Sequence, residues 1–235
     1  MLYNISMNKK VRAVGRIAFT LIEIAVFILL LIDSISDFIP SHERNILCYV
    51  AVIFAAIIAF VFTPKDEYKN RGFLLLSYIF IIAADYFLLF TESAIGIYFF
   101  IGAQICFQLF ISKVKLFPLL LIIEVLVIGI MCLIIFTTSL KDSFDTALTI
   151  PALVYYTALI FNIISSIVVY RKEKGLKYLV TLSLVFLFFC DTSIGLFNIT
   201  SISIFNELIW LFYIICHILL GNYLTLKCEK EILKP

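Results

Sequence analysis

The fold is decided by residues 73–110, FLLLSYIFIIAADYFLLFTESAIGIYFFIGAQICFQLF, in which two apolar runs are joined by a short bend around Glu92. Each run is long enough to cross a bilayer as a helix, which takes about 20 apolar residues. The first run carries Asp85 and the second carries Gln104. A carboxylate inside a span costs at least about 2.5–3.5 kcal/mol on insertion scales, so Asp85 indicates a functional site within the membrane.

The composition of the whole chain agrees with this local pattern. Apolar residues make up 63% and charged residues 14% of the sequence, and the mean hydropathy is +1.13. These values predict an integral membrane protein, for which we expect no nucleic-acid partner. The apolar runs are long and continuous, which favours helices over the alternating segments of a membrane barrel. The six cysteines show no metal-ligand spacing and no nucleotide-binding motif occurs, so we expect no metal and no cofactor.

The chain is predicted to be one all-α transmembrane domain, residues 1–235, with eight helices in one bundle. All but two of the 18 basic residues, Arg44 and Lys141, fall on the same side of the predicted spans. By the positive-inside rule both termini are then cytoplasmic, in a multi-pass protein of the cell membrane. The predicted spans are 17–38, 46–62, 73–90, 94–112, 116–137, 147–170, 177–197 and 203–226.

A second aspartate repeats the setting of the first. Arg71 precedes Asp85 by the same number of residues as Lys177 precedes Asp191, and each segment enters from the cytoplasmic side. With a rise of about 1.5 Å per residue, the two acids lie at one depth, in the outer half of the bilayer. Two interpretations stay open, a four-plus-four duplication with parallel halves or chance in a low-diversity apolar sequence.

If the helices that carry them adjoin, Asp85, Asp191, Gln104 and His217 line one polar cavity. Two acids that share a site divide into a proton donor and a carboxylate, as general acid–base catalysis requires. The competing interpretation is structural, with both acids bonded to neighbouring groups and fixing only the packing of the helices.

The other polar residues in the spans indicate a function less specifically. Asn162 lies about two helical turns beyond Tyr156, and it either extends a polar face or joins two helices. Glu23 is within reach of the cytoplasmic interface, so its side chain is expected to extend to the water there. Asp33 and Glu207 lie near the outer surface, where we expect them to be solvated.

Four segments resemble the YhhN-like lysoplasmalogenase family of eight-span membrane proteins. AADYFLLF (83–90) is similar to the family's Gly-Asp-x-x-Leu segment, and GIYFFIGAQICF (96–107) to the signature that follows it. FFCDTSIGLF (188–197) resembles the Ser-Asp-x-x-Leu-Ala-x-x-x-Phe segment, and YIICHILLG (213–221) resembles Tyr-x-x-Ala-Gln-x-Leu-Ile. The resemblance in spacing extends over all eight predicted spans.

The sequence also departs from the family pattern. Gln104 stands where the family has His, and His217 stands where it has Gln, so the pair is present with its members exchanged. The Lys-Pro pair at the start of the second helix is missing, and Arg44 is the nearest basic residue. Both aspartates, Asp85 and Asp191, remain.

The resemblance implies hydrolysis of the vinyl-ether bond of lysoplasmalogens, with a membrane lipid or lysolipid as substrate. Asp85 and Asp191 would divide the acid and carboxylate roles, and Arg44 would meet the phosphate near the outer surface. Residues expected to bind or orient the substrate are Gln104, His217, Asn162, Tyr156 and Arg44.

Three alternatives to an active hydrolase stay open. The same carboxyls would serve a proton-coupled small-molecule transporter or a receptor-like binder. The exchanged His and Gln are also compatible with a catalytically inactive relative. The sequence leaves the oligomeric state open.

Overall fold

The computed structural model describes residues 9–36, 38–63, 68–91, 94–111, 117–137, 146–170 and 177–231. These residues form eight α-helices and no strand, which confirms the predicted all-helical class. The helices are α1 (Lys9–Ser36), α2 (Ser41–Phe62), α3 (Tyr68–Phe90), α4 (Ile95–Ile111), α5 (Phe117–Thr137), α6 (Thr146–Tyr170), α7 (Tyr178–Thr200) and α8 (Ser203–Glu231).

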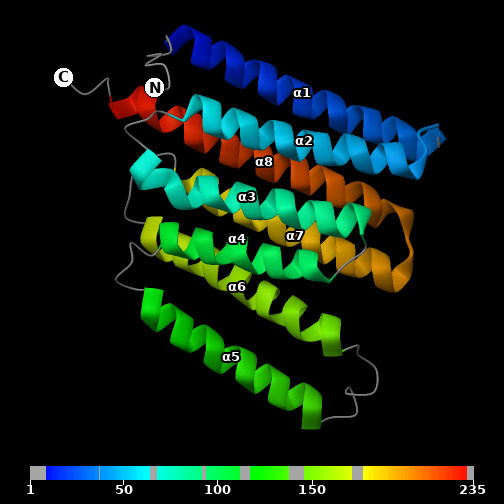
Figure 1. The fold of residues 1–235 in the computed structure, drawn as a ribbon, viewed down its shortest axis with the longest axis vertical. Coiled ribbons are helices and arrows are strands. Elements are labelled where there is room, and N and C mark those ends of the chain that lie inside the picture. The colour runs from blue at the N-terminus through cyan, green and yellow to red at the C-terminus, as the bar shows by residue number, and fades with distance from the viewer. Residues whose placement is uncertain are drawn as a thin grey trace.

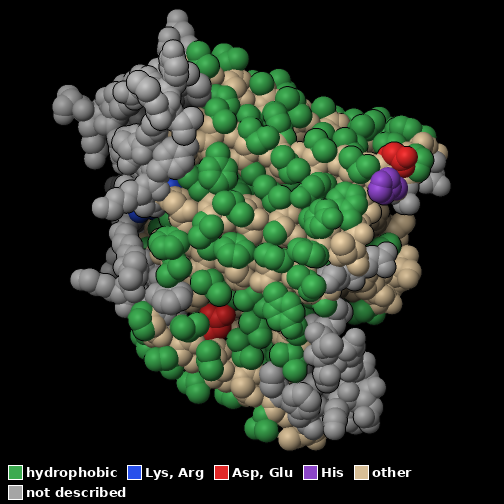
Figure 2. Space-filling model, in the orientation of Figure 1, with side chains coloured by type: hydrophobic (Ala, Val, Ile, Leu, Met, Phe, Trp, Pro, Cys, Tyr) green, Lys and Arg blue, Asp and Glu red, His purple; other side chains and the backbone are tan. Residues whose placement is uncertain are grey.

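The length and composition of the helices are those of a multi-pass integral membrane protein. In the described part of the chain, α1, α2, α3, α6, α7 and α8 are each long and apolar enough to cross a membrane. The apolar segments of α4 and α5, Ile95–Ile111 and Leu121–Met131, are shorter. Hydrophobic side chains cover most of the visible face, with few charged groups among them (Figure 2). A surface of this kind is suited to lipid.

Seven of the helices form a closed ring, in which α1, α2, α3, α4, α6, α7 and α8 contact one another in that order and α8 returns to α1. An additional contact between α2 and α8 crosses this ring, and α5 packs against α6 at the edge of the bundle (Figure 1). The beginning of α1 and the end of α8 lie at the same end of the bundle (Figure 1). The ring brings α3, α7 and α8, far apart in sequence, around a common interior.

Small residues allow the helices to approach closely, as is usual in membrane proteins. A Cβ atom on Gly96 of α4 would lie 2.8 Å from the backbone oxygen of Ala84 on α3 and 2.5 Å from Cγ of Leu88. Ala84 directly precedes Asp85, so the close contact between α3 and α4 fixes the backbone that carries this acid.

The observed helices differ from the predicted spans mainly at their ends. The span predicted over 46–62 is too short, because α2 begins at Ser41, directly after Pro40. Hydropathy marks only the apolar part of a helix, whereas the polar first turn of α2 continues the same helix outward. The consequence for the site is that Arg44 lies on a regular helix and not in a loop.

Candidate functional site

Asp85 of α3 and Asp191 of α7 line the same cavity, whose volume is about 200 Å³. Both side chains are buried, at 7% and 9% exposure. The remaining wall is mostly apolar, so the two acids are the ionisable carboxyl groups of this cavity. The lining residues are Val52, Asp85, Leu88, Leu89, Phe100, Cys190, Asp191, Ile194, Asn206, Ile209, Trp210 and Tyr213.

A tyrosine holds each acid. The hydroxyl of Tyr213 on α8 donates to Oδ2 of Asp85 over 2.5 Å, and the hydroxyl of Tyr155 on α6 donates to Oδ2 of Asp191 over 2.5 Å. These separations are at the short end for a hydroxyl on a carboxylate, where bonds are stronger than between neutral groups. Each acid keeps its second oxygen for other chemistry.

Sequence reasoning did not identify these tyrosines as partners of the acids. One signal was present, because Tyr213 precedes His217 by one helical turn and so lies on the same face of α8. Tyrosine is common in apolar helices, and its spacing alone does not indicate which of several acids it meets.

Gln104 and Asn162 contact each other and are absent from the lining of the cavity. Nδ2 of Asn162 on α6 donates to the backbone oxygen of Gln104 and to its Oε1, both over 2.9 Å. Both side chains are fully buried between α4 and α6. The structure therefore places this pair as an interhelical contact, and its role toward a substrate stays a prediction.

His217 lies one turn from Tyr213 and packs edge to face on that ring, with 4.5 Å between ring centroids. It lines a second, smaller cavity together with Glu23 of α1. The expectation that Glu23 extends to the interface is wrong, because its side chain is 1% exposed. The position of a residue along a helix does not determine which side of the helix its side chain lies on. Glu23 is on the side of α1 that faces the other helices.

Tyr156 lies beside the main cavity and does not line it. Its ring contacts those of Tyr155 and Phe188, with centroid separations of 5.8 and 6.3 Å. It therefore supports the tyrosine that holds Asp191.

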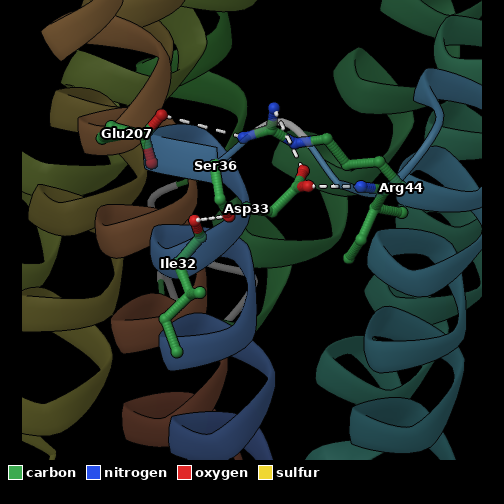
Figure 3. A network of polar contacts seen from close by, with 6 residues as sticks. Ile32, Asp33, Ser36, Arg44 and Glu207 are labelled. Atoms are coloured by element: carbon green, nitrogen blue, oxygen red, sulfur yellow. Dashed lines mark hydrogen bonds and ion pairs between the residues drawn. The ribbon is translucent and has the colours of Figure 1, made fainter.

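Arg44 joins the end of α1 to the beginnings of α2 and α8 (Figure 3). Its guanidinium lies 3.7 Å from Asp33 on α1 and 3.7 Å from Glu207 on α8. The second carboxylate oxygen of Asp33 accepts a hydrogen bond from the backbone N–H of Ile39 over 2.7 Å. Asp33, predicted to be solvated, is 1% exposed, because the longer α2 brings a cation over it.

The neighbours of Arg44 and of its partner Glu207 in the sequence contact or line the main cavity. The next residue, Asn45, donates to the backbone oxygen of Leu89, a cavity-lining residue, over 3.0 Å. Asn206, the neighbour of Glu207, lines the cavity as well. Within the described ranges, no group of three potential metal ligands is found.

The fold and the site together define a class, the multi-pass helical membrane proteins with paired acids in an apolar cavity. A model of the YhhN family matches residues 45–223, which is more than half of the 235-residue chain and includes both acids. The chain belongs to the YhhN family. No curated protein and no solved structure matches it.

Proposed function

We propose that this protein is a membrane hydrolase that cleaves the vinyl-ether bond of lysoplasmalogen-type lysophospholipids, with Asp85 and Asp191 as catalytic residues. The observation that carries the proposal is that these acids, from α3 and α7, line one largely apolar cavity. An acid–carboxylate pair in such a cavity has the groups that an oxocarbenium-type reaction needs, as in glycoside hydrolysis.

The reaction requires one proton transfer at carbon and one water. The protonated acid gives its proton to the vinyl carbon remote from the ether oxygen, and the ionised acid stabilises the resulting oxocarbenium ion. Water adds to the carbon bonded to oxygen, and the proton that it loses returns to the first carboxylate. The hemiacetal then breaks its carbon–oxygen bond to give an aldehyde and a glycerophospho alcohol, which balances one substrate and one water.

The tyrosines hold the two carboxyls in fixed orientations during these steps. Tyr213 and Tyr155 each donate to one carboxylate oxygen, which leaves the other oxygen of Asp85 and of Asp191 for the proton or for the developing cation. Groups held in place before the reaction need no reorganisation in the transition state, which is where such sites gain most of their effect.

The size of the cavity supports a lipid substrate. About 200 Å³ accommodates the vinyl-ether segment and not a whole lysolipid, whose tail and head group would extend beyond it. Arg44, at the outer ends of the helices near the cavity, is proposed to meet the phosphate. His217 and Tyr156 would then orient the reactants through the walls of the cavity and not by lining it, whereas Gln104 and Asn162 would hold α4 and α6 together.

We further propose that all eight helices span the cell membrane, with both termini in the cytoplasm. The distribution of basic residues supports this topology, since all but Arg44 and Lys141 lie on one side of eight spans. The position of α4 within the ring, between α3 and α6, also favours a membrane-spanning role for this shorter helix.

The test is the release of aldehyde from a lysoplasmalogen by the purified protein. Asp85→Asn and Asp191→Asn should each lower turnover by about 10²–10⁴-fold, the usual effect of removing a general acid or base. Glu124→Gln, at a buried acid of α5 outside the cavity lining, is the control and should retain activity. The saturated ether analogue should not be cleaved.

Other outcomes decide against the proposal. A folded protein that turns over no vinyl-ether lipid is not this hydrolase. Uptake of a solute into vesicles that depends on a proton gradient and is lost in Asp85→Asn would identify a transporter. The absence of both activities, with the fold intact, would indicate an inactive relative.

A further inference from the structure

A second cavity lies directly behind the wall of the first, between α1, α2 and α8. Its volume of about 10 Å³ is close to the space that one water molecule needs. Val52, Trp210 and Tyr213 line both cavities, so one layer of side chains separates this small space from the acids. Glu23 and His217 are the polar side chains on its far wall.

Polar atoms around this space lack partners within the described part of the chain. On its wall they are Oε1 of Glu23 and Nδ1 and Nε2 of His217. The hydroxyl of Tyr78, which is not a lining residue, also lacks a partner, and its ring is 5.7 Å from the imidazole. The three side chains are 1%, 3% and 0% exposed. A buried polar group without a partner costs about 1–3 kcal/mol, and nearly all such groups are therefore satisfied by protein or by internal water.

The crossing junction between α4 and α6 is filled differently, by two side chains that meet. Gln104 of α4 meets Asn162 of α6 directly, although Nε2 of Gln104 and Oδ1 of Asn162 have no partner among the described residues. On the α2 side of the small cavity the lining residues are Cys48, Ala51 and Val52, none of which replaces the amide of Asn162. A gap of the size of a water is left where the other junction has a side chain.

We propose that Glu23, Tyr78 and His217 bind one internal water molecule, and that this hydrated cluster fixes His217 against Tyr213. The imidazole contacts the ring of Tyr213 at 83° between planes, and Tyr213 donates to Asp85. The water site thus links α1 and α3 to the orientation of a catalytic acid. His217 is a positioning residue, and only this last step rests on the proposed hydrolase function.

The water site can be tested without turnover. The chain has two histidines, so a sample labelled with nitrogen-15 histidine in the His42→Gln background reports on His217 alone. The full chain in nanodiscs should show a magnetisation-transfer cross-peak between the His217 ring and a slowly exchanging water. Glu23→Gln and Tyr78→Phe should each shift the ring nitrogen signals of His217, whereas Glu124→Gln, the buried acid of the other half, should leave them unchanged.

The result that overturns the site is a His217 ring with no water cross-peak and with signals insensitive to both Glu23→Gln and Tyr78→Phe. Tyr78→Phe removes one hydroxyl and keeps the ring, so it decides the question even if the glutamate variant does not fold.

The positioning role is tested by two replacements of the imidazole. His217→Phe keeps a ring against Tyr213 but cannot hold the water, and it should lower kcat about tenfold with little change in KM. His217→Gln supplies the amide found at Gln104 and should restore most of this loss. Equal kcat in wild type and His217→Phe excludes the role. If the wild type releases no aldehyde, the proposed function fails, while the histidine spectra still decide the water site.

Discussion

The first four helices and the last four share most of their helix contacts and differ in two places. Among the described residues α1 packs against α8 whereas α5 has no comparable contact with α4, and the two crossing junctions are filled differently. The contacts α1·α2, α2·α3 and α3·α4 have counterparts in α5·α6, α6·α7 and α7·α8, and the contact α2·α8 has its counterpart in α4·α6 (Figure 1). This agreement favours duplication over chance as the source of the repeated Arg71–Asp85 and Lys177–Asp191 spacing.

The second difference lies in how the two crossing junctions are filled. At α4·α6 the amides of Gln104 and Asn162 bond directly, although Nε2 of Gln104 and Oδ1 of Asn162 have no partner within the described part of the chain. At α2·α8 the imidazole of His217 has no such partner, and a small cavity remains beside it. Both cavities border α8, so the two halves differ in the space that they leave between their helices.

The acids show the same departure from symmetry. Tyr155 precedes Asp191 by 36 residues, and Tyr49 precedes Asp85 by the same number. Tyr49 instead packs on the rings of Tyr86 and Phe90, and Asp85 takes its hydrogen bond from Tyr213 on α8. One acid is thus held within its own half, and the other is held across the two halves.

The largest expected effect follows from the two tyrosine hydroxyls. Tyr213→Phe and Tyr155→Phe each remove a hydrogen bond to a carboxylate, worth about 1.5–3 kcal/mol, so aldehyde release should fall about 10- to 100-fold in each. Tyr49→Phe, at the corresponding position that holds no acid, is the matched control and should match the wild type. A large loss in only one of the two variants would mean that the acids do not act as an equivalent pair.

The contact between α3 and α4 gives the next effect. A methyl group on Gly96 would collide with the backbone of Ala84, whereas a Cβ on Gly195 of α7 meets nothing within 4 Å. Gly96→Ala should lower the free energy of unfolding by about 1–3 kcal/mol and also reduce activity, because α3 must move beside Asp85. Gly195→Ala should be neutral or slightly stabilising through helix propensity. If Gly96→Ala and the wild type unfold at the same midpoint in detergent, α3 and α4 are not in close contact.

The helices could be predicted from sequence because long apolar runs determine them, and a fixed rise per residue predicted that the two acids lie at one level of the bundle. In agreement with that prediction, the structure shows Asp85 and Asp191 lining one cavity. Rotation about each helix axis could not be predicted, since runs rich in Leu, Ile and Phe show no polar face. Glu23 and Asp33 were therefore assigned to water, whereas both are buried.

A smaller effect distinguishes the ion pairs of Arg44 from its proposed contact with the substrate phosphate. Arg44→Gln removes both long ion pairs, and Asp33→Asn removes one of them while leaving an oxygen for the N–H of Ile39. Each substitution should cost about 1 kcal/mol in the free energy of unfolding, the upper range for partly exposed pairs. Only Arg44→Gln should raise KM for the lysolipid if the guanidinium meets the phosphate. The same rise in KM for both variants would show that Arg44 acts only by holding α1, α2 and α8 together.

The smallest effect is expected at the junction of α4 and α6, where we expect the amide pair to serve packing alone. Asn162→Leu leaves the Oε1 of Gln104 without its donor, and interhelical bonds of this kind are worth about 0.6 kcal/mol in a membrane. Thr157→Val on the same helix removes a hydroxyl bonded only to the backbone of α6 and is the control. The double variant with Gln104→Leu should recover most of the loss, because replacing both partners removes the unpaired group. The cycle is measured by unfolding in mixed micelles, and aldehyde release should stay constant throughout. A fall in kcat larger than the loss of stability explains would show that this amide pair, like His217, affects the catalytic step.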